Sequence, residues 1–217
     1  MPYLLLARHG ESEYNAKNLF TGVTDAPLTE KGREQAAVMA SAIKDMQPSM
    51  AYTSALMRAQ DTLEIILHEN GWDNTPVISN TSLNERDYGE MTGKNKAELE
   101  QMYGTEQFLK LRRGWNEPIA NGETLETVYK RVVVYFTDQI LPNLKRGQDI
   151  LIVAHGNTLR ALIKHLDDLD DKQVETLEMP LVEIVVYDYE VRIASKQVRA
   201  FQAKLPFVTV NSTYIKD

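Results

Sequence analysis

The chain contains no cysteine, and this absence removes several kinds of chemistry at once. Disulfide bonds, thiolate nucleophiles and cysteine-ligated zinc sites are all excluded. No apolar run approaches the length of a membrane span. The opening "MPYLLLARHG" has no basic segment before its apolar one, unlike a signal peptide. We therefore expect a cytoplasmic protein with no membrane partner.

Positive charge is also in short supply. The 24 lysines and arginines are outnumbered by 31 aspartates and glutamates, which gives a net charge of -7. A general nucleic-acid partner needs a basic face, so this balance argues against one, and any basic cluster must be local. The length of 217 residues suits one core. We expect a single domain over residues 1–217, with a polar insertion at about 87–122.

Short apolar segments alternate with amphipathic ones along the chain. We predict strands at 3–7, 50–55, 149–156, 182–190 and 198–203, a further strand that runs into a loop within 75–86, and helices at 30–46, 56–71, 123–144 and 157–169. Such alternation predicts an α/β fold of three layers (α/β/α), with a mostly parallel central sheet. The insertion is expected to be small, mainly helical, and placed over the active site.

Two of the four histidines share one unusual context. "LLLARHGES" and "ILIVAHGNT" each run an apolar strand into a His-Gly pair, at His9 and at His155. Residues just past the carboxyl ends of parallel strands line the ligand crevice, so we expect both imidazoles at one site. The glycine after each histidine permits close approach of backbone or ligand. His68 and His165 lie late in predicted helices and are expected to be structural.

Arginines accompany these histidines. Arg8 precedes His9, and Arg58 follows the strand end "YTSA", so both are candidates for the same crevice. A guanidinium binds two phosphoryl oxygens at once, and an imidazole beside such cations is suited to attack phosphorus. Taken alone, Arg58 fits a solvated ion pair equally well. Metal ligation is disfavoured, because arginines repel a cation and no HExxH motif is present.

Glu85 in "SLNERDYGE" is a candidate general acid and base. A carboxylic acid there can donate a proton to a leaving oxygen and recover it from the incoming one. An ion pair with Arg86 is the competing interpretation, and the sequence alone slightly favours it. The P-loop and the dinucleotide fingerprint are both absent, which argues against a nucleotide-driven kinase.

Together these motifs resemble the histidine phosphatase superfamily and, within it, the cofactor-dependent phosphoglycerate mutases. The resemblance extends to about Asp170 and is carried by "RHGESEYNAKNLFTG", "TDAPLTEKG", "AYTSALMRAQDTL", "LNERDYGEMTGKNKAE", "LRRGW" and "AHGNTLRAL". It implies an isomerase that interconverts 2-phosphoglycerate and 3-phosphoglycerate in glycolysis and gluconeogenesis. A phosphohistidine primed by 2,3-bisphosphoglycerate, without a metal, would carry the reaction.

The resemblance also implies residue roles. The catalytic set would be His9 as nucleophile, Glu85 as acid and base, and His155, Arg8 and Arg58 around the phosphoryl group. The substrate or cofactor would be bound by Asn15, Thr21, Gly22, Tyr88, Lys96, Arg112, Arg113, Gly156 and Asn157. Because Lys96, Arg112 and Arg113 form a local basic cluster, an acidic protein can still bind a phosphoglycerate.

Two other functions remain as alternatives. A phosphatase would use the same catalytic residues and lose the phosphoryl group to water; a non-catalytic phosphometabolite-binding module is the more distant possibility. The full anion cradle in the insertion favours the mutase. The oligomeric state stays open between a monomer and a homo-oligomer.

The sequence departs from the family pattern in three segments. The segment after Trp115 is short, and because the corresponding segment of relatives helps subunit contacts and covers the site, the oligomeric state stays open. The segment "EMPLVEIVVY" lacks the small-residue turn of the family, so part of the substrate-facing wall should differ. The end "LPFVTVNSTYIKD" lacks the expected lysine-containing tail, so closure of the site against water should be weaker.

Overall fold

A mixed β-sheet forms the centre of the molecule. The computed structural model describes residues 2–189, 195–200 and 208–210. Within them the strands follow the spatial order β3-β2-β4-β1-β5-β6-β7. The strands are β1 (Tyr3–Arg8), β2 (Met50–Thr53), β3 (Val77–Ser79), β4 (Ile150–Ala154), β5 (Glu183–Asp188), β6 (Ser195–Ala200) and β7 (Val208–Val210). The ladders among β1, β2, β3 and β4 are parallel, and β5, β6 and β7 add antiparallel ladders.

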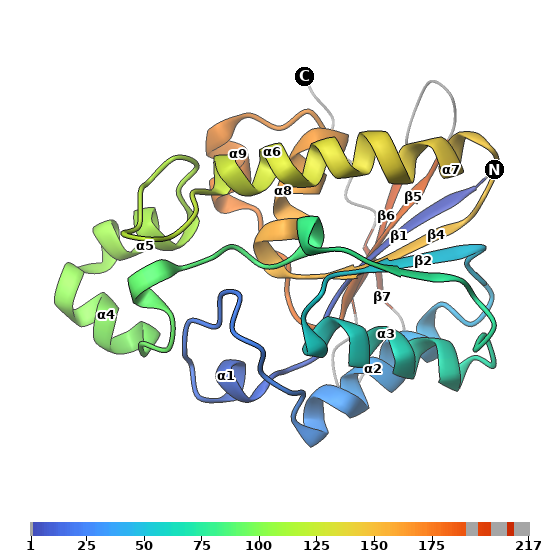
Figure 1. Cartoon of the computed structure of the whole chain (residues 1–217), viewed down its shortest axis with the longest axis horizontal. Helices are drawn as coiled ribbons and strands as arrows, with labels where there is room; N and C mark the ends of the chain where they lie inside the picture. Colours follow the sequence, from blue (N-terminus) through green and yellow to red (C-terminus); the bar gives the residue numbers. More distant parts are fainter. Residues whose placement is uncertain (1, 190–194, 201–207, 211–217) are drawn as a thin grey trace.

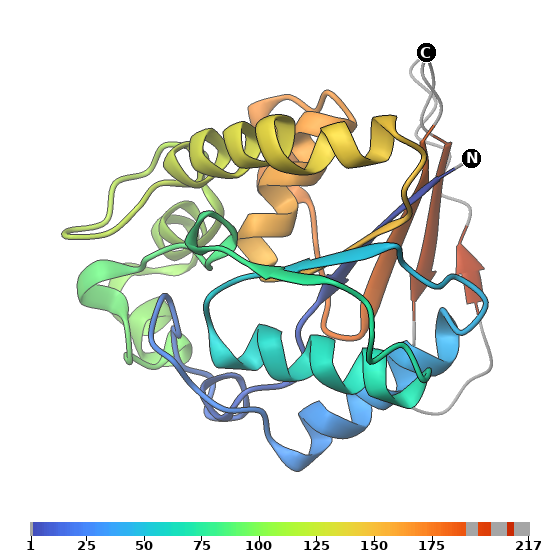
Figure 2. The ribbon, with the colours of Figure 1, turned by 45° about the vertical axis from the view of Figure 1, so that its right-hand side comes forward.

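Helices cover both faces of this sheet, as Figures 1 and 2 show. The helices α2 (Glu30–Ala42) and α3 (Met57–Glu69) lie on one face. The helices α6 (Leu125–Tyr135), α7 (Leu141–Lys145), α8 (Gly156–Leu166) and α9 (Asp171–Thr176) lie toward the other. The predicted α/β/α fold is confirmed.

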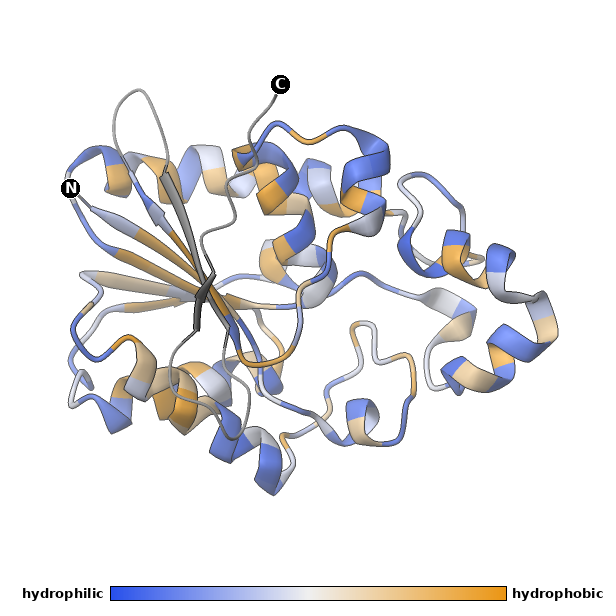
Figure 3. Cartoon of the chain, turned by 180° about the vertical axis from the view of Figure 1, so that it is seen from behind, coloured by the Kyte–Doolittle hydropathy of each residue, from blue (hydrophilic) through white to orange (hydrophobic). Residues whose placement is uncertain are grey.

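Alternation along the strands explains the two faces. In β1, Leu4 and Leu6 pack into the core with α6 and α8, whereas Leu5 and Ala7 pack into the core with α2 and α3. This is the two-residue period of a strand buried on both sides. Figure 3 shows the apolar colour gathered on the central strands and on the helix surfaces that face them.

The helix predicted at 123–144 is interrupted. A π-helical turn, Phe136–Ile140, separates α6 from α7, and Pro142 lies at the start of α7. Proline lacks an N–H and crowds the preceding turn, so a regular α-helix cannot continue through it. The π turn keeps Phe136 and Ile140 buried while the chain passes this proline.

The segment 87–122 forms a small helical layer beside the sheet. It contains the 3-10 turn Gly89–Met91, α4 (Lys96–Tyr103) and α5 (Thr105–Arg113). A separate apolar cluster holds it together: Phe20, Tyr88, Met91, Leu99, Phe108 and Ile119. Phe20 belongs to the loop that follows the short helix α1 (Glu13–Ala16), so this loop packs on the insertion.

The remaining strand predictions concern residues 75–86 and the C-terminal part of the chain, which is only partly described. Within 75–86, where a strand running into a loop is expected, the strand is β3, and the 3-10 turn Thr81–Leu83 lies in the segment that follows it. Of the strand expected at 198–203, residues 201–203 lie outside the described part, as does the tail 205–217 apart from β7. In the part of the chain that is described, no helix is long and apolar enough to cross a membrane.

Candidate active site

The two histidine motifs meet at the carboxyl end of neighbouring parallel strands. In the β1–β4 ladder Arg8 pairs with Ala154, so His9 and His155 leave the sheet side by side. Their ring centroids are 5.0 Å apart. Both side chains are buried. The structure therefore brings the two imidazoles together, as the parallel register requires.

The two glycines that follow these histidines differ in how closely other atoms approach them. A Cβ on Gly10 would lie 2.2 Å from the carbonyl oxygen of Gly32, and a Cβ on Gly32 would lie 2.1 Å from that of Glu11. Two glycines therefore let the start of α2 touch the His9 loop. A Cβ on Gly156 would lie 3.6 Å from the Arg8 side chain, which is an ordinary contact.

His9 is oriented by its own loop. Its Nδ1 lies 2.6 Å from the carbonyl oxygen of Gly10. A carbonyl only accepts, so Nδ1 carries the proton and Nε2 keeps its lone pair. Burial, reinforced by the charges of Arg58 and Arg8, lowers the pKa of His9 well below its ordinary value. The ring is therefore neutral at physiological pH, with Nε2 available as a nucleophile.

His155 is held by a residue that the sequence did not single out. Its Nε2 lies 2.7 Å from Ser54 Oγ, at the end of β2. Its Nδ1 is buried and has no hydrogen-bond partner among the described residues. Burial, with the charge of Arg58 next in importance, lowers the pKa of this ring as well. Ser54 lies inside the "YTSA" motif, which was the available signal.

Arg58 is not the solvated residue of the alternative interpretation. It is 1% exposed, and its guanidinium donates to the carbonyl oxygens of Gly22 and Thr24 at 2.9 Å each. Burial lowers its pKa to about 10, so it remains a cation at neutral pH. Arg8 donates to the carbonyl of Met179. The Nε atoms of both arginines are buried without a partner among the described residues, which suits an anionic ligand.

Glu85 is held by backbone N–H groups rather than by the neighbouring arginine. Its Oε1 accepts from Arg86 N at 2.7 Å and from Asn157 N, in the first turn of α8, at 3.2 Å. The Arg86 side chain donates instead to backbone carbonyls, including those of Glu123 and Leu111. The Glu85–Arg86 ion pair considered from the sequence is therefore wrong.

One pocket gathers the candidate residues. The predicted site residues that line it are Arg8, His9, Asn15, Thr21, Gly22, Arg58, Glu85, Tyr88, Lys96, Arg112, Arg113, Gly156 and Asn157. His155 is not among the lining residues but contacts the His9 ring. The described structure thus places all the candidates in or directly beneath the same pocket.

Four further residues line the pocket: Phe20, Arg160, Glu178 and Met179. Arg160 donates to Asn157 Oδ1 at 2.8 Å, and the Asn157 amide donates to Tyr88 OH at 2.8 Å. Burial lowers the pKa of Arg160 to about 10. Phe20 and Arg160 both lie inside motifs that carried the resemblance, although neither stood out by residue type.

Glu178 and Met179 form the wall where the sequence departs from the family pattern. Glu178 makes an ion pair with Arg113, and its side chain is 65% exposed. The turn ends at Val182, whose φ is +66°. That left-handed conformation is strained for a β-branched residue, by about 1–3 kcal/mol.

Lys96 completes the positive side of the pocket. Its Nζ lies 5.6 Å from the centre of the Phe20 ring, within range of a cation–π contact. Burial, followed by the charges of Arg112 and Arg8, lowers the pKa of Lys96 to about 8.

Positive charge dominates the lining. Six cationic side chains, Arg8, Arg58, Lys96, Arg112, Arg113 and Arg160, face only two carboxylates, Glu85 and Glu178. The acidic protein therefore concentrates its basic residues where an anion would bind. Among the described residues, no group of three or more His, Cys, Asp or Glu side chains is arranged to hold a metal ion.

Known proteins are similar in sequence to this chain. Residues 4–198 match the family model "Histidine phosphatase superfamily (branch 1)". A "2,3-bisphosphoglycerate-dependent phosphoglycerate mutase" from Parvibaculum lavamentivorans is 45% identical over 193 residues, which cover 88% of this chain and 92% of the relative. The protein of that name from Cytophaga hutchinsonii is 40% identical over 193 residues, covering 89% of this chain and 90% of the relative.

Solved structures share the fold at lower identity. A mycobacterial glucosyl-3-phosphoglycerate phosphatase superposes with a TM-score of 0.75 at 26% identity, covering 87% of this chain and 93% of its own. Bacillus stearothermophilus YhfR gives a TM-score of 0.77 at 26% identity, with 89% and 94% coverage.

Proposed function

The chain belongs to the histidine phosphatase superfamily, and we propose that it is a 2,3-bisphosphoglycerate-dependent phosphoglycerate mutase that interconverts 2-phosphoglycerate and 3-phosphoglycerate. The observation that carries this proposal is a neutral imidazole, His9, at the bottom of a pocket with six cationic side chains. One phosphoryl group does not need so many cations, whereas a phosphoglycerate adds a carboxylate, and the bisphosphate adds a second phosphoryl group.

The chemistry follows from the orientation of His9. Its Nε2 attacks phosphorus, so that an N–P bond forms while the O–P bond to the leaving group breaks. Glu85 gives its proton to the leaving oxygen and later takes a proton from the hydroxyl that receives the phosphoryl group. Arg8 and Arg58 stabilise the charge on the phosphoryl oxygens through their unpartnered Nε–H groups.

The residues present fit the cofactor that the relatives' name implies. Arg8, Arg58 and Arg160 each have a buried Nε–H group with no hydrogen-bond partner among the described residues, and these groups can donate to anionic oxygens of a ligand. When bound, 2,3-bisphosphoglycerate supplies the phosphoryl group that primes the enzyme. Lys96, Arg112 and Arg113 would hold the part of the ligand that lies away from His9.

The rest of the proposal concerns organisation and location. We assign residues 1–217 to one domain with an insertion at about 87–122. The reaction belongs to glycolysis and gluconeogenesis, so we place the protein in the cytoplasm, acting on small-molecule phosphoglycerates without a metal. The finding that favours the alternative, a phosphatase, is the likeness to a solved phosphatase at 26% identity; relatives of 40–45% identity weigh more.

A coupled assay separates the two functions. Isomerisation of 3-phosphoglycerate and release of phosphate are measured on the same sample, with and without added 2,3-bisphosphoglycerate. The mutase requires isomerisation that depends on the bisphosphate and greatly exceeds phosphate release. Rapid release without isomerisation would leave only the phosphatase, and loss of activity in a chelator would show that a metal is needed.

A further inference from the structure

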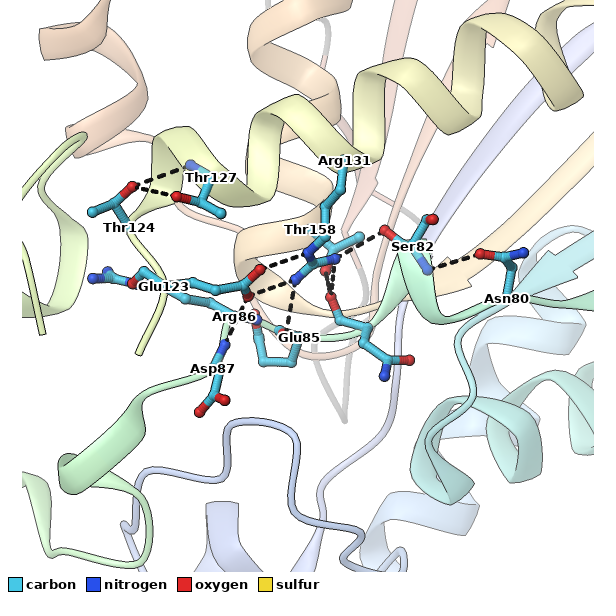
Figure 4. Close-up of polar contacts among 11 residues, drawn as sticks. Asn80, Ser82, Glu85, Arg86, Asp87, Glu123, Thr124, Thr127, Arg131 and Thr158 are labelled. Carbon is cyan, nitrogen blue, oxygen red and sulfur yellow. Dashed lines mark hydrogen bonds and ion pairs between the residues drawn. The ribbon is translucent and has the colours of Figure 1, made fainter. Parts of the chain in front are cut away.

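Arg131, a residue of α6 that lies outside the pocket, hydrogen-bonds the backbone of the short segment that carries Glu85. All five N–H donors of the Arg131 guanidinium are used. Its Nη1 donates to the carbonyl oxygens of Ser82 and Asn84, at 2.9 Å each, and its Nη2 donates to that of Glu85 at 3.1 Å. Its Nε and Nη2 also donate to the two carboxylate oxygens of Glu123, at 2.9 Å each. Figure 4 shows the guanidinium between Ser82, Glu85 and Glu123.

Glu123 holds the other side of the same segment. Its carboxylate accepts from Asp87 N at 3.0 Å, and its own N–H donates to the Asp87 carbonyl at 2.8 Å. Its carbonyl accepts from Arg86 Nε at 2.6 Å. Glu123 and Arg131 therefore fasten the backbone on both sides of Glu85, as Figure 4 shows.

Neither side chain lines the pocket. Both are only partly exposed, so solvent weakens the pair less than a surface ion pair. Burial raises the pKa of Glu123, but the Arg131 hydrogen bonds and the Asp87 N–H outweigh it and lower the pKa overall. The carboxylate therefore stays charged, and a planar fork of this kind fixes geometry better than a lysine would.

We propose that Arg131 and Glu123 are positioning residues that hold the Glu85 carboxyl where it can exchange a proton with the substrate oxygen. The inference rests on the proposed function, in which Glu85 is the general acid and base. Its physical reason is that proton transfer requires hydrogen-bond distance, so an error of about 1 Å can cost about 100-fold in rate. The transfer to His9 Nε2 itself does not need Glu85 when the leaving group departs without a proton.

Two phosphoryl donors therefore distinguish a misplaced Glu85 carboxyl from a general disruption of the active site. Dinitrophenyl phosphate releases a stable anion, dinitrophenolate, that needs no proton. The rate of the dinitrophenolate burst in a stopped-flow experiment therefore depends on His9 and the arginines and not on Glu85. Radiolabelled 2,3-bisphosphoglycerate releases an alkoxide that must be protonated, and rapid quench measures its transfer to the protein. Arg131→Met should slow the second reaction by about 100-fold and the first by less than about 3-fold.

Milder variants keep the test sharp if Arg131→Met fails to fold. Arg131→Lys keeps the charge without the fork, and Glu123→Gln removes the charge but not the shape, so both should give intermediate losses confined to the bisphosphate reaction. Lys130→Met is the matched control, because Lys130 is the neighbouring cation on α6 and pairs with Glu126 on the surface. It should leave both rates unchanged.

The outcomes are distinguishable. If the variants of Arg131 and Glu123 slow both donors equally, or slow neither, the positioning role is overturned while the proposed function stands. If the unmodified protein reacts with neither donor, the proposed function fails, and this inference fails with it.

Discussion

The pocket has a floor and a rim that are built on different principles. The floor comprises Arg8, His9 and Arg58, with His155 directly beneath it; Arg8 ends β1, His9 and His155 directly follow β1 and β4, and Arg58 lies in the first turn of α3. The structure fastens these residues with fixed groups: the Gly10 carbonyl, the Ser54 hydroxyl and the carbonyls that receive the arginine N–H groups. Such groups are already in place before a ligand binds, which is what electrostatic stabilisation of a transition state requires.

The rim is carried by the insertion instead. Lys96 begins α4, and Arg112 and Arg113 end α5, on a layer with a small apolar cluster of its own. Its cations pair with side chains or ring faces, as Arg113 does with Glu178 and Lys96 with Phe20. We propose that the floor determines the chemistry and that the rim determines which phosphoester is held.

The strongest test of the floor removes its nucleophile. His9→Ala should lower isomerisation by about 10⁴-fold or more and abolish labelling by the bisphosphate, because no other step replaces N–P bond formation. Retention of labelled protein after this change would show that another residue takes the phosphoryl group. His68→Ala is the control, since His68 pairs with Asp73 on the surface and should not matter.

Close packing beneath His9 should be visible in stability. Gly10→Ala places a methyl group 2.2 Å from the Gly32 carbonyl, so we expect a loss of about 3 kcal/mol in the free energy of unfolding. Thermal unfolding followed by circular dichroism measures it. Gly156→Ala, which makes only an ordinary contact, should change the melting temperature far less. Equal shifts would mean that the two His-Gly turns are built alike.

The rim should affect binding more than turnover. Lys96→Gln should weaken binding of 3-phosphoglycerate to the unphosphorylated enzyme by about 10-fold, since one charged contact is lost, and change kcat much less. Lys94→Gln is the control, because Lys94 does not line the pocket. A fall in kcat that matches that of His9→Ala would contradict the division between floor and rim.

The same lysine predicts a pH dependence. Its pKa of about 8 means that Lys96 is charged below that pH and loses its proton above it. Its contribution to affinity is therefore full below pH 8 and falls as the pH rises. Calorimetric titration of 3-phosphoglycerate from pH 7 to 9 should show the weakening, and Lys96→Gln should reduce it.

The smallest effect concerns Glu178. Its ion pair with Arg113 occupies a rim cation, so an anionic ligand must compete with it. Because the carboxylate is largely exposed, Glu178→Gln should tighten binding of 3-phosphoglycerate by only about 3-fold. Glu106→Gln, which removes an exposed carboxylate paired with Lys110 outside the pocket, should not. Weaker binding by Glu178→Gln would show that the carboxylate assists the ligand.

Sequence patterns predicted the floor well because its geometry is local. A histidine that directly follows a buried parallel strand must emerge at the sheet's carboxyl edge, so His9 and His155 were expected to meet. The partners of these residues are different. Ser54, Gly32 and Arg131 act through contacts with segments remote in sequence. Ser54 and Gly32 lie inside quoted motifs, but nothing in the motifs shows which residues they contact, and Arg131 lies outside all of them.

The buried environment of Arg58 and Arg86 decides between the alternatives that the sequence left open for Arg58 and Glu85. Arg58 in isolation fits a surface ion pair, and only the path of the loop around Gly22 encloses it. The ion pair between Glu85 and Arg86 fails for the same reason, because the Glu123 and Leu111 carbonyls draw the arginine away. Glu178 lies in a segment where the family pattern ends, so the resemblance could not assign it a place.

The central claim is that His9 carries the phosphoryl group on Nε2. Brief reaction with 2,3-bisphosphoglycerate, followed by peptide mapping and phosphorus NMR in alkali, identifies both the residue and the ring nitrogen. We predict a single phosphohistidine at His9, substituted at Nε2, because Nδ1 is occupied by the Gly10 carbonyl. Phosphate on Nδ1, on His155 or on no histidine would contradict the account.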